Sequence, residues 1–138
     1  MTNGFMLDTS TCIDLLRGHR GVARDRFNAE QGRIHLSTVA LAELLIGPPK
    51  AKGSPRRRED LEAFVARVRV LDFDAAAAEQ YADIRTDLER RGTRIGPYDL
   101  QIAGHARSRG FVMVTGNLRE FSRVDGLRCE NWLTGEET

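Results

Sequence analysis

The sequence predicts an α/β fold in which a central, mostly parallel sheet is flanked by helices on both sides. Two short apolar runs, residues 5–7 and 111–114, have the length and unbroken hydrophobicity of buried parallel strands. Between them, apolar residues recur three and four positions apart, which is the spacing of an amphipathic helix. Strand and helix patterns alternate along the chain, and this alternation is typical of proteins with a parallel sheet.

The individual elements follow from these patterns and from the residues that begin and end helices. Residues 9–11 are N-cap candidates for the first helix, Ser37 or Thr38 for the third, and Asp74 for the longest one. We expect helices around residues 12–16, 22–30, 39–46, 58–68, 75–91 and 98–108. We expect strands around residues 5–7, 33–36, 70–73, 111–114 and 127–129.

The chain has 138 residues, a usual size for one domain, so we expect a single domain over residues 1–138. We expect a basic loop with Pro and Gly at about residues 47–58 and a short tail at residues 133–138. Cys12 and Cys129 lack the spacing of a zinc site or a disulfide framework, so both are expected as free thiols.

Charge and hydropathy argue against polyanion binding through the overall charge and against a membrane-spanning segment. The formal net charge is +1, so any nucleic-acid contact depends on local clusters of charge and not on the molecule as a whole. No stretch approaches the roughly 20 apolar residues that cross a bilayer. The N-terminus also lacks the pattern of a secretory signal. We therefore expect a cytoplasmic protein that makes no membrane contact.

Polar side chains follow the predicted strands where a parallel sheet places its active site. Asp8 comes directly after the first strand, and residues 115–117 follow the strand at 111–114. Asp99 lies in the first turn of a helix that opens with Gly and Pro, and Glu43 stands inside an apolar helical run. Because ligand sites of such sheets lie at the carboxyl ends of the strands, we expect these side chains to gather there.

A gathered set of carboxylates favours divalent metal and phosphodiester chemistry. Three ionised acids repel one another at neutral pH, and Mg²⁺ or Mn²⁺ relieves the repulsion through the hard oxygen ligands it prefers. One or two such ions are suited to hydrolysis of a phosphodiester bond. Each acid also has a simpler interpretation: Asp8 as a helix cap, Asp99 as a partner of the helix dipole, and Glu43 as a solvent-facing side chain.

The order and spacing of these segments resemble those of VapC-type toxins of the PIN-domain ribonuclease family. The similarity lies in residues 6–10, 42–44, 96–103 and 114–121, with a closing segment at 130–132. It implies a PIN fold and an endoribonuclease that depends on Mg²⁺ or Mn²⁺, cleaves structured RNA such as tRNA or rRNA, and inhibits translation. It also implies a homodimer, a cognate VapB-type antitoxin and a higher toxin–antitoxin complex.

The resemblance assigns roles to individual residues. Asp8, Glu43 and Asp99 would be catalytic metal ligands, and Asn117 would take the fourth catalytic position, which is often an acid in the family. Glu120 lies one helical turn beyond Asn117 and could compensate for its neutrality. As supporting groups, the hydroxyl of Thr115 is suited to orienting a ligand or water, and Ser10 stands where the family frequently has asparagine.

Two basic clusters are candidates for RNA contact. The first lies in the predicted loop and helix start, and comprises Lys50, Lys52, Arg56, Arg57 and Arg58; a solvated charge run is the alternative. The second, near Asp99, comprises Arg85, Arg90, Arg91 and Arg94, and their alternation with acids favours ion pairs on a helix surface. Apolar residues such as Leu15, Leu16 and Phe27 fit either an antitoxin groove or the core.

Three other functions are weighed against a ribonuclease. A phosphatase with an aspartyl nucleophile would want a second aspartate at position 10, where the chain has Ser10. A receiver domain needs a lysine after a late strand, whereas both lysines lie in the predicted loop. The third alternative keeps the PIN fold as an RNA- or partner-binding module with weak or no catalysis, which the neutral Asn117 would suit.

Overall fold

The computed structural model describes residues 3–18, 21–47 and 54–138. Within them, five strands form one parallel sheet in the order β3-β2-β1-β4-β5. The strands are β1 (Phe5–Leu7), β2 (Ile34–Ser37), β3 (Arg69–Leu71), β4 (Val112–Val114) and β5 (Cys129–Glu130). The helices are α1 (Thr9–Leu16), α2 (Val22–Ala29), α3 (Thr38–Ile46), α4 (Pro55–Val65), α5 (Ala75–Arg90), α6 (Pro97–Arg109) and α7 (Leu118–Phe121).

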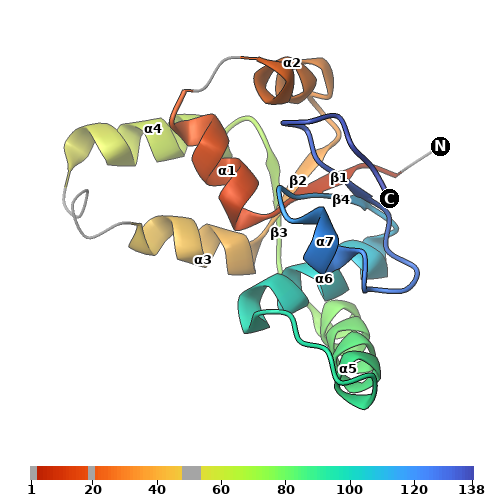
Figure 1. The fold of residues 1–138 in the computed structure, drawn as a ribbon. Coiled ribbons are helices and arrows are strands. Elements are labelled where there is room, and N and C mark those ends of the chain that lie inside the picture. Colours follow the sequence, from red (N-terminus) through yellow and green to blue (C-terminus); the bar gives the residue numbers. More distant parts are fainter. Residues whose placement is uncertain (1–2, 19–20, 48–53) are drawn as a thin grey trace.

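The strand order places the chain reversal of the sheet between β1 and β4. From β1 the chain moves outward through β2 to β3, then crosses to the other side of β1 for β4 and β5. Figure 1 shows α1, α2 and α4 on one side of the sheet and α5, α6 and α7 on the other. The predicted α/β fold with helices on both faces is therefore confirmed, and the crevice at the carboxyl ends of β1 and β4 is where such folds bind ligands.

Most predicted helix boundaries lie within two residues of those in the structure, and of the two interpretations of the first cap, Asp8 or one of residues 9–11, the structure shows Asp8. The side chain of Asp8, and not a residue at positions 9–11, accepts a hydrogen bond from the backbone N–H of Thr11 (2.8 Å) and begins α1. Asp8 is the last extended residue after β1, and aspartate is as good an N-cap as serine or threonine. Ser37 and Asp74 cap α3 and α5 as expected.

Two predicted strands are displaced by side-chain and turn hydrogen bonds. β3 ends at Leu71 because the N–H of Phe73 donates to the hydroxyl of Thr38 (3.1 Å) and not to the sheet. β5 begins at Cys129, whereas Leu127 still belongs to a turn closed by its N–H to the carbonyl of Val124 (3.4 Å).

The predicted loop at residues 47–58 is too long. Residues 48–53 lie outside the described part of the chain, but α4 already begins at Pro55. Ser54 caps it through its hydroxyl, which accepts from the N–H of Arg57 (3.3 Å), and proline is well suited to the first helical position.

The C-terminal tail folds back on the last strand. Its residues 133–138 are exposed, yet Glu137 forms an antiparallel bridge with Glu130, and the N–H of Thr138 donates to the carbonyl of Cys129 (3.0 Å). Both cysteines are free and buried, as expected. None of the helices described is long and apolar enough to span a bilayer.

Helices α5 and α6 pack closely because α6 carries a glycine at their contact. A Cβ added at Gly104 would lie 2.7 Å from the backbone nitrogen of Tyr81 in α5. Glycine in the middle of a helix normally lowers its stability, so close approach of the backbones is the physical reason for it here. This contact fixes the helix that bears Asp99.

We expect Gly104→Ala to destabilise the fold by about 1–3 kcal/mol, since overpacking a closed contact outweighs the better helix propensity of alanine. Urea unfolding followed by circular dichroism measures the effect. Gly116→Ala is the control, because no heavy atom of the described residues, its two chain neighbours aside, lies within 4 Å of its added Cβ. Equal stability of the two variants would contradict the packing argument.

Candidate active site

Asp8 is the most buried acid of the site and is held by the end of β4. Its residue is 3% exposed, and its N–H donates to the carbonyl of Val114 (3.0 Å), which pairs β1 with β4 up to the strand ends. Its carboxylate accepts hydrogen bonds from Thr11 and from the hydroxyl of Thr115. Burial raises the pKa of Asp8, and these hydrogen bonds oppose the rise because they stabilise the charged form.

Glu43 reaches the same region from α3. It is partly buried, and one of its carboxylate oxygens accepts a hydrogen bond from the hydroxyl of Thr9 (2.6 Å) in the first turn of α1. This bond joins α3 to the residue that follows Asp8. It sets the direction of the Glu43 side chain, which the sequence had left open between the site and solvent.

Asp99 lies in the first turn of α6 and faces the other acids. Burial raises its pKa to about 6, and the negative charges of Asp8, Glu120 and Glu43 add to the rise in that order. Four carboxylates, one directly after β1 and the others on α3, α6 and α7, therefore lie within electrostatic reach of one another.

The end of β4 contributes the polar groups opposite Asp8. Thr115 is 1% exposed, and its hydroxyl accepts a hydrogen bond from the N–H of Asn117 (3.0 Å). Asn117 itself is exposed, and its side-chain amide donates to the carboxylate of Glu120. The amide and the carboxylate of Glu120 thus form one hydrogen-bonded unit at the rim of the site.

No cation within the described residues neutralises these acids. Among the ion pairs of residues 3–18, 21–47 and 54–138, none involves Asp8, Glu43, Asp99 or Glu120. In the same ranges, no three Asp, Glu, His or Cys side chains are arranged as ligands of one ion. The donors are all hard oxygens, and their repulsion is what a divalent cation removes. The chemistry of this donor set fits Mg²⁺ or Mn²⁺, although the spacing does not form a closed coordination shell.

The described arginines of the basic cluster predicted for RNA contact already have partners, in α4 itself or in α3. Arg56 pairs with Asp60 (3.8 Å), Arg58 pairs with Glu62 (3.2 Å), and Arg57 donates to the carbonyl of Leu44. Lys50 and Lys52, the rest of this predicted cluster, lie outside the described residues.

The structure also places Ser10 and the apolar residues that were candidates for an antitoxin groove. Ser10 is exposed in the first turn of α1. Leu15 and Phe27 are 2% and 1% exposed, so the core interpretation of these residues holds for both, while Leu16 is only partly buried.

Two threonines with direct contacts to the acids were missed as site residues. Thr9 and Thr11 were considered only as caps, yet one holds Glu43 and the other holds Asp8. Their position directly after a strand-end aspartate is the signal that could have found them, because the first turn of α1 then faces the same crevice.

Comparison with known proteins places the chain in a family. A family model described as PIN domain matches residues 5–127. A relative from Shigella flexneri, named as a tRNA(fMet)-specific endonuclease VapC, is 49% identical over 93% of this chain and 97% of that protein.

Solved structures show the same relationship. A DNA-bound VapBC structure from Salmonella typhimurium aligns with a TM-score of 0.83 and 45% identity, over 94% of this chain and 98% of that one. A VapBC2 structure from Rickettsia felis, bound to a promoter DNA fragment, aligns with a TM-score of 0.86 and 34% identity, over 93% and 98%. The chain belongs to the PIN-domain family and, within it, to the VapC ribonucleases.

Proposed function

We propose that the chain is the toxin of a toxin–antitoxin pair, an endoribonuclease that uses Mg²⁺ or Mn²⁺ to hydrolyse a phosphodiester bond in a structured RNA. The observation that carries the proposal is the cluster of four carboxylates at the crevice between β1 and β4, with the pKa of Asp99 raised to about 6 by burial and by the other three. Such a cluster matches the need of a site that binds cations and the phosphates they accompany.

The substrate we propose is the initiator tRNA. The support is the 49% identity to a relative whose name specifies tRNA(fMet), over nearly the whole of both chains. The site is open at its rim, where Asn117 and Glu120 are accessible, which suits a folded RNA better than a small molecule.

In this proposal Asp8, Glu43 and Asp99 hold the metal through their carboxylate oxygens. The hydrogen bonds from Thr11 and Thr115 fix Asp8, and the bond from Thr9 fixes Glu43, so fewer side-chain rotations are needed when the ion binds. Asn117 and Glu120 border the reacting phosphate. The bound ion would activate water and stabilise the charge that develops on the phosphate during in-line displacement.

We infer the protein partners of this chain from the solved structures that it resembles. VapBC complexes are among the solved structures most similar to this chain, so we propose a VapB-type antitoxin as its inhibitor and a homodimer within a larger complex. An antitoxin side chain bearing a guanidinium would be attracted to the unpaired acids of the site. The neutral Asn117 keeps one alternative, an RNA-binding module with weak catalysis.

Asp8→Asn and Asp99→Asn are each expected to lower RNA cleavage at least 100-fold. Asparagine caps a helix as well as aspartate, so Asp8→Asn removes the charge and keeps α1. Gel analysis of an initiator tRNA transcript and of total RNA, in Mg²⁺, in Mn²⁺ and in EDTA, measures the effect.

Asp125→Asn is the matched control, since this exposed aspartate lies outside the cluster and is expected to keep full activity. Wild-type activity in Asp8→Asn would show that this residue acts only as a cap. Absence of metal-dependent cleavage by the wild type, purified free of antitoxin, would favour the binding module.

Stability in the absence of metal is expected to fall as the pH rises through the range from about 4 to 6. The folded pKa of Asp99 lies above its ordinary value of 3.8, so the folded state binds a proton that the unfolded chain has already released. Asp99→Asn removes this penalty, so the variant should melt at a higher temperature than the wild type at pH 7.5, with the gap closing toward pH 4. Thermal unfolding in EDTA measures it, and a gap independent of pH would contradict the assignment.

Added Mn²⁺ is expected to give the wild type a higher melting temperature than Asp99→Asn, the reverse of the order without metal. An ion that binds only the folded wild type raises its melting temperature in proportion to the logarithm of the ion concentration. Asp99→Asn loses a ligand and should respond much less in the same thermal scan. A shift of equal size in both proteins would place the ion elsewhere.

A further inference from the structure

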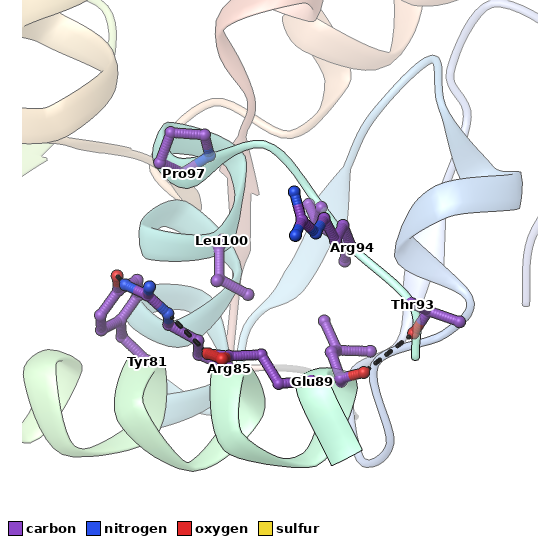
Figure 2. Close-up of a pocket in the computed structure, with 9 residues that line it drawn as sticks. Tyr81, Arg85, Glu89, Thr93, Arg94, Pro97 and Leu100 are labelled. Atoms are coloured by element: carbon purple, nitrogen blue, oxygen red, sulfur yellow. Dashed lines mark hydrogen bonds and ion pairs between the residues drawn. The ribbon is translucent and has the colours of Figure 1, made fainter. Parts of the chain in front are cut away.

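A cavity lies beside the first turn of α6 and is also lined by α5 and by residues 93–95. Its volume is about 350 Å³, within the range of small ligand pockets. Figure 2 shows Tyr81 and Arg85 of α5 on one wall, Thr93 and Arg94 on the other, and Pro97 and Leu100 of α6 between them. The buried side chains of Leu88, Ile95 and Leu100 supply an apolar lining.

The wall that carries Arg94 is held in place from both ends. The N–H of Thr93 donates to the carbonyl of Leu88 (2.9 Å) at the end of α5. The guanidinium of Arg123 donates to the backbone carbonyl of Arg94 (3.0 Å), and the guanidinium of Arg91 donates back to the carbonyl of Arg123. These bonds hold the backbone of the wall, and they leave the Arg94 side chain without a hydrogen bond or ion pair to any residue in the described ranges.

The arginines near this cavity differ in how far their charge is neutralised. Arg85 pairs with Glu89 (2.9 Å) and donates to the hydroxyl of Tyr81 (2.8 Å), while Arg90 and Arg91 both pair with Asp87. Arg94 is exposed and forms no ion pair with any residue that the structure describes. Of the second basic cluster, it alone offers an available positive charge within that part of the chain.

The cavity and the acidic cluster share one helical turn. Pro97 and Leu100 line the cavity, and Asp99 stands between them in the sequence and faces the acids. A polynucleotide whose scissile phosphate lies at Asp99 would therefore carry its neighbouring nucleotide past the cavity. The cluster of carboxylates repels an approaching phosphate backbone, so a nearby cation is needed to hold the adjoining phosphate.

We propose that this cavity binds one unpaired nucleotide of the RNA next to the cleaved bond, with the base against Tyr81 and Leu100 and the phosphate at Arg94. The proposal rests on the proposed function, since it assigns a subsite to the same substrate. An aromatic ring beside an apolar floor accepts a stacked base, and a guanidinium accepts a phosphate.

Arg94→Ala tests the phosphate contact, with Arg94→Lys keeping the charge and Arg90→Ala as the matched control, because Arg90 is an exposed, ion-paired arginine of the same cluster. We expect Arg94→Ala to lower kcat/KM on the initiator tRNA transcript roughly 5- to 10-fold, with kcat at saturating RNA within about twofold of the wild type. Arg94→Lys and Arg90→Ala should stay within about twofold for both.

Binding is measured separately, in the Asp99→Asn background, by fluorescence anisotropy with the same labelled transcript. Arg94→Ala should raise Kd by a similar factor and reduce the salt dependence of log Kd by roughly 0.7 to 0.9, as expected for one phosphate contact. Tyr81→Leu should weaken binding, whereas Tyr81→Phe keeps the ring and the affinity. Thermal unfolding verifies that each variant is folded.

Equal effects of Arg94→Ala and Arg90→Ala would overturn the proposal, as would equal affinity of the two Tyr81 variants. A change in the size-exclusion profile that accompanies the loss of binding in Arg94→Ala would also overturn it, because the cavity would then serve a protein contact. If the wild type cleaves no RNA, the proposed function fails, while the binding comparison in the Asp99→Asn background still decides the subsite.

Discussion

Repulsion between the carboxylates at the carboxyl ends of β1 and β4 is the constraint that the rest of this structure has to satisfy. Asp8 is fixed there by the sheet itself, since Leu7 pairs with Val114 and the next residue of each strand enters the crevice. The other acids arrive on helices, and each must be held against a like charge. Burial raises the pKa of Asp99, and the negative charges of Asp8, Glu120 and Glu43 raise it further, so its ionised form is disfavoured at this position.

The helices that carry the acids are joined through the core below the site. Ser37 caps α3 and also contacts the ring of His105 in α6 (2.9 Å), and both residues are at most 1% exposed. This buried contact links the helix of Glu43 to the helix of Asp99. Gly104, one residue away, lets α6 lie against the backbone of α5. Packing therefore resists a separation of the acids that electrostatics alone would favour.

Local sequence signals predicted what depends on neighbours in the chain. The strand cores, the caps at Ser37 and Asp74 and the strand-end position of Asp8 all follow from hydrophobic runs and short-range chemistry. The hydroxyl of Thr9 on Glu43 bridges 34 residues, and no local pattern encodes that contact. The start of α4 at Pro55 was missed because proline and arginine together resemble a loop, although proline favours the first helical turn. The sequence also did not show which arginines form ion pairs with acids, because those pairs depend on the three-dimensional arrangement.

The nearly neutral net charge of the chain is compatible with binding a polyanion because the acids of the crevice and the ion-paired arginines occupy different parts of the molecule. At the crevice, acids gather without an ion pair to any residue that the structure describes, while most arginines around α5 form ion pairs with acids of the same helix. Paired side chains contribute little to the field felt by an RNA, since each ion pair is a short-range dipole screened by salt. An exposed guanidinium such as that of Arg94, on a segment held by Arg123, instead keeps its full positive charge, since no described residue pairs with it. For such a chain, the balance between an acidic centre and a few unpaired arginines, and not the total charge, determines where a phosphate backbone can lie.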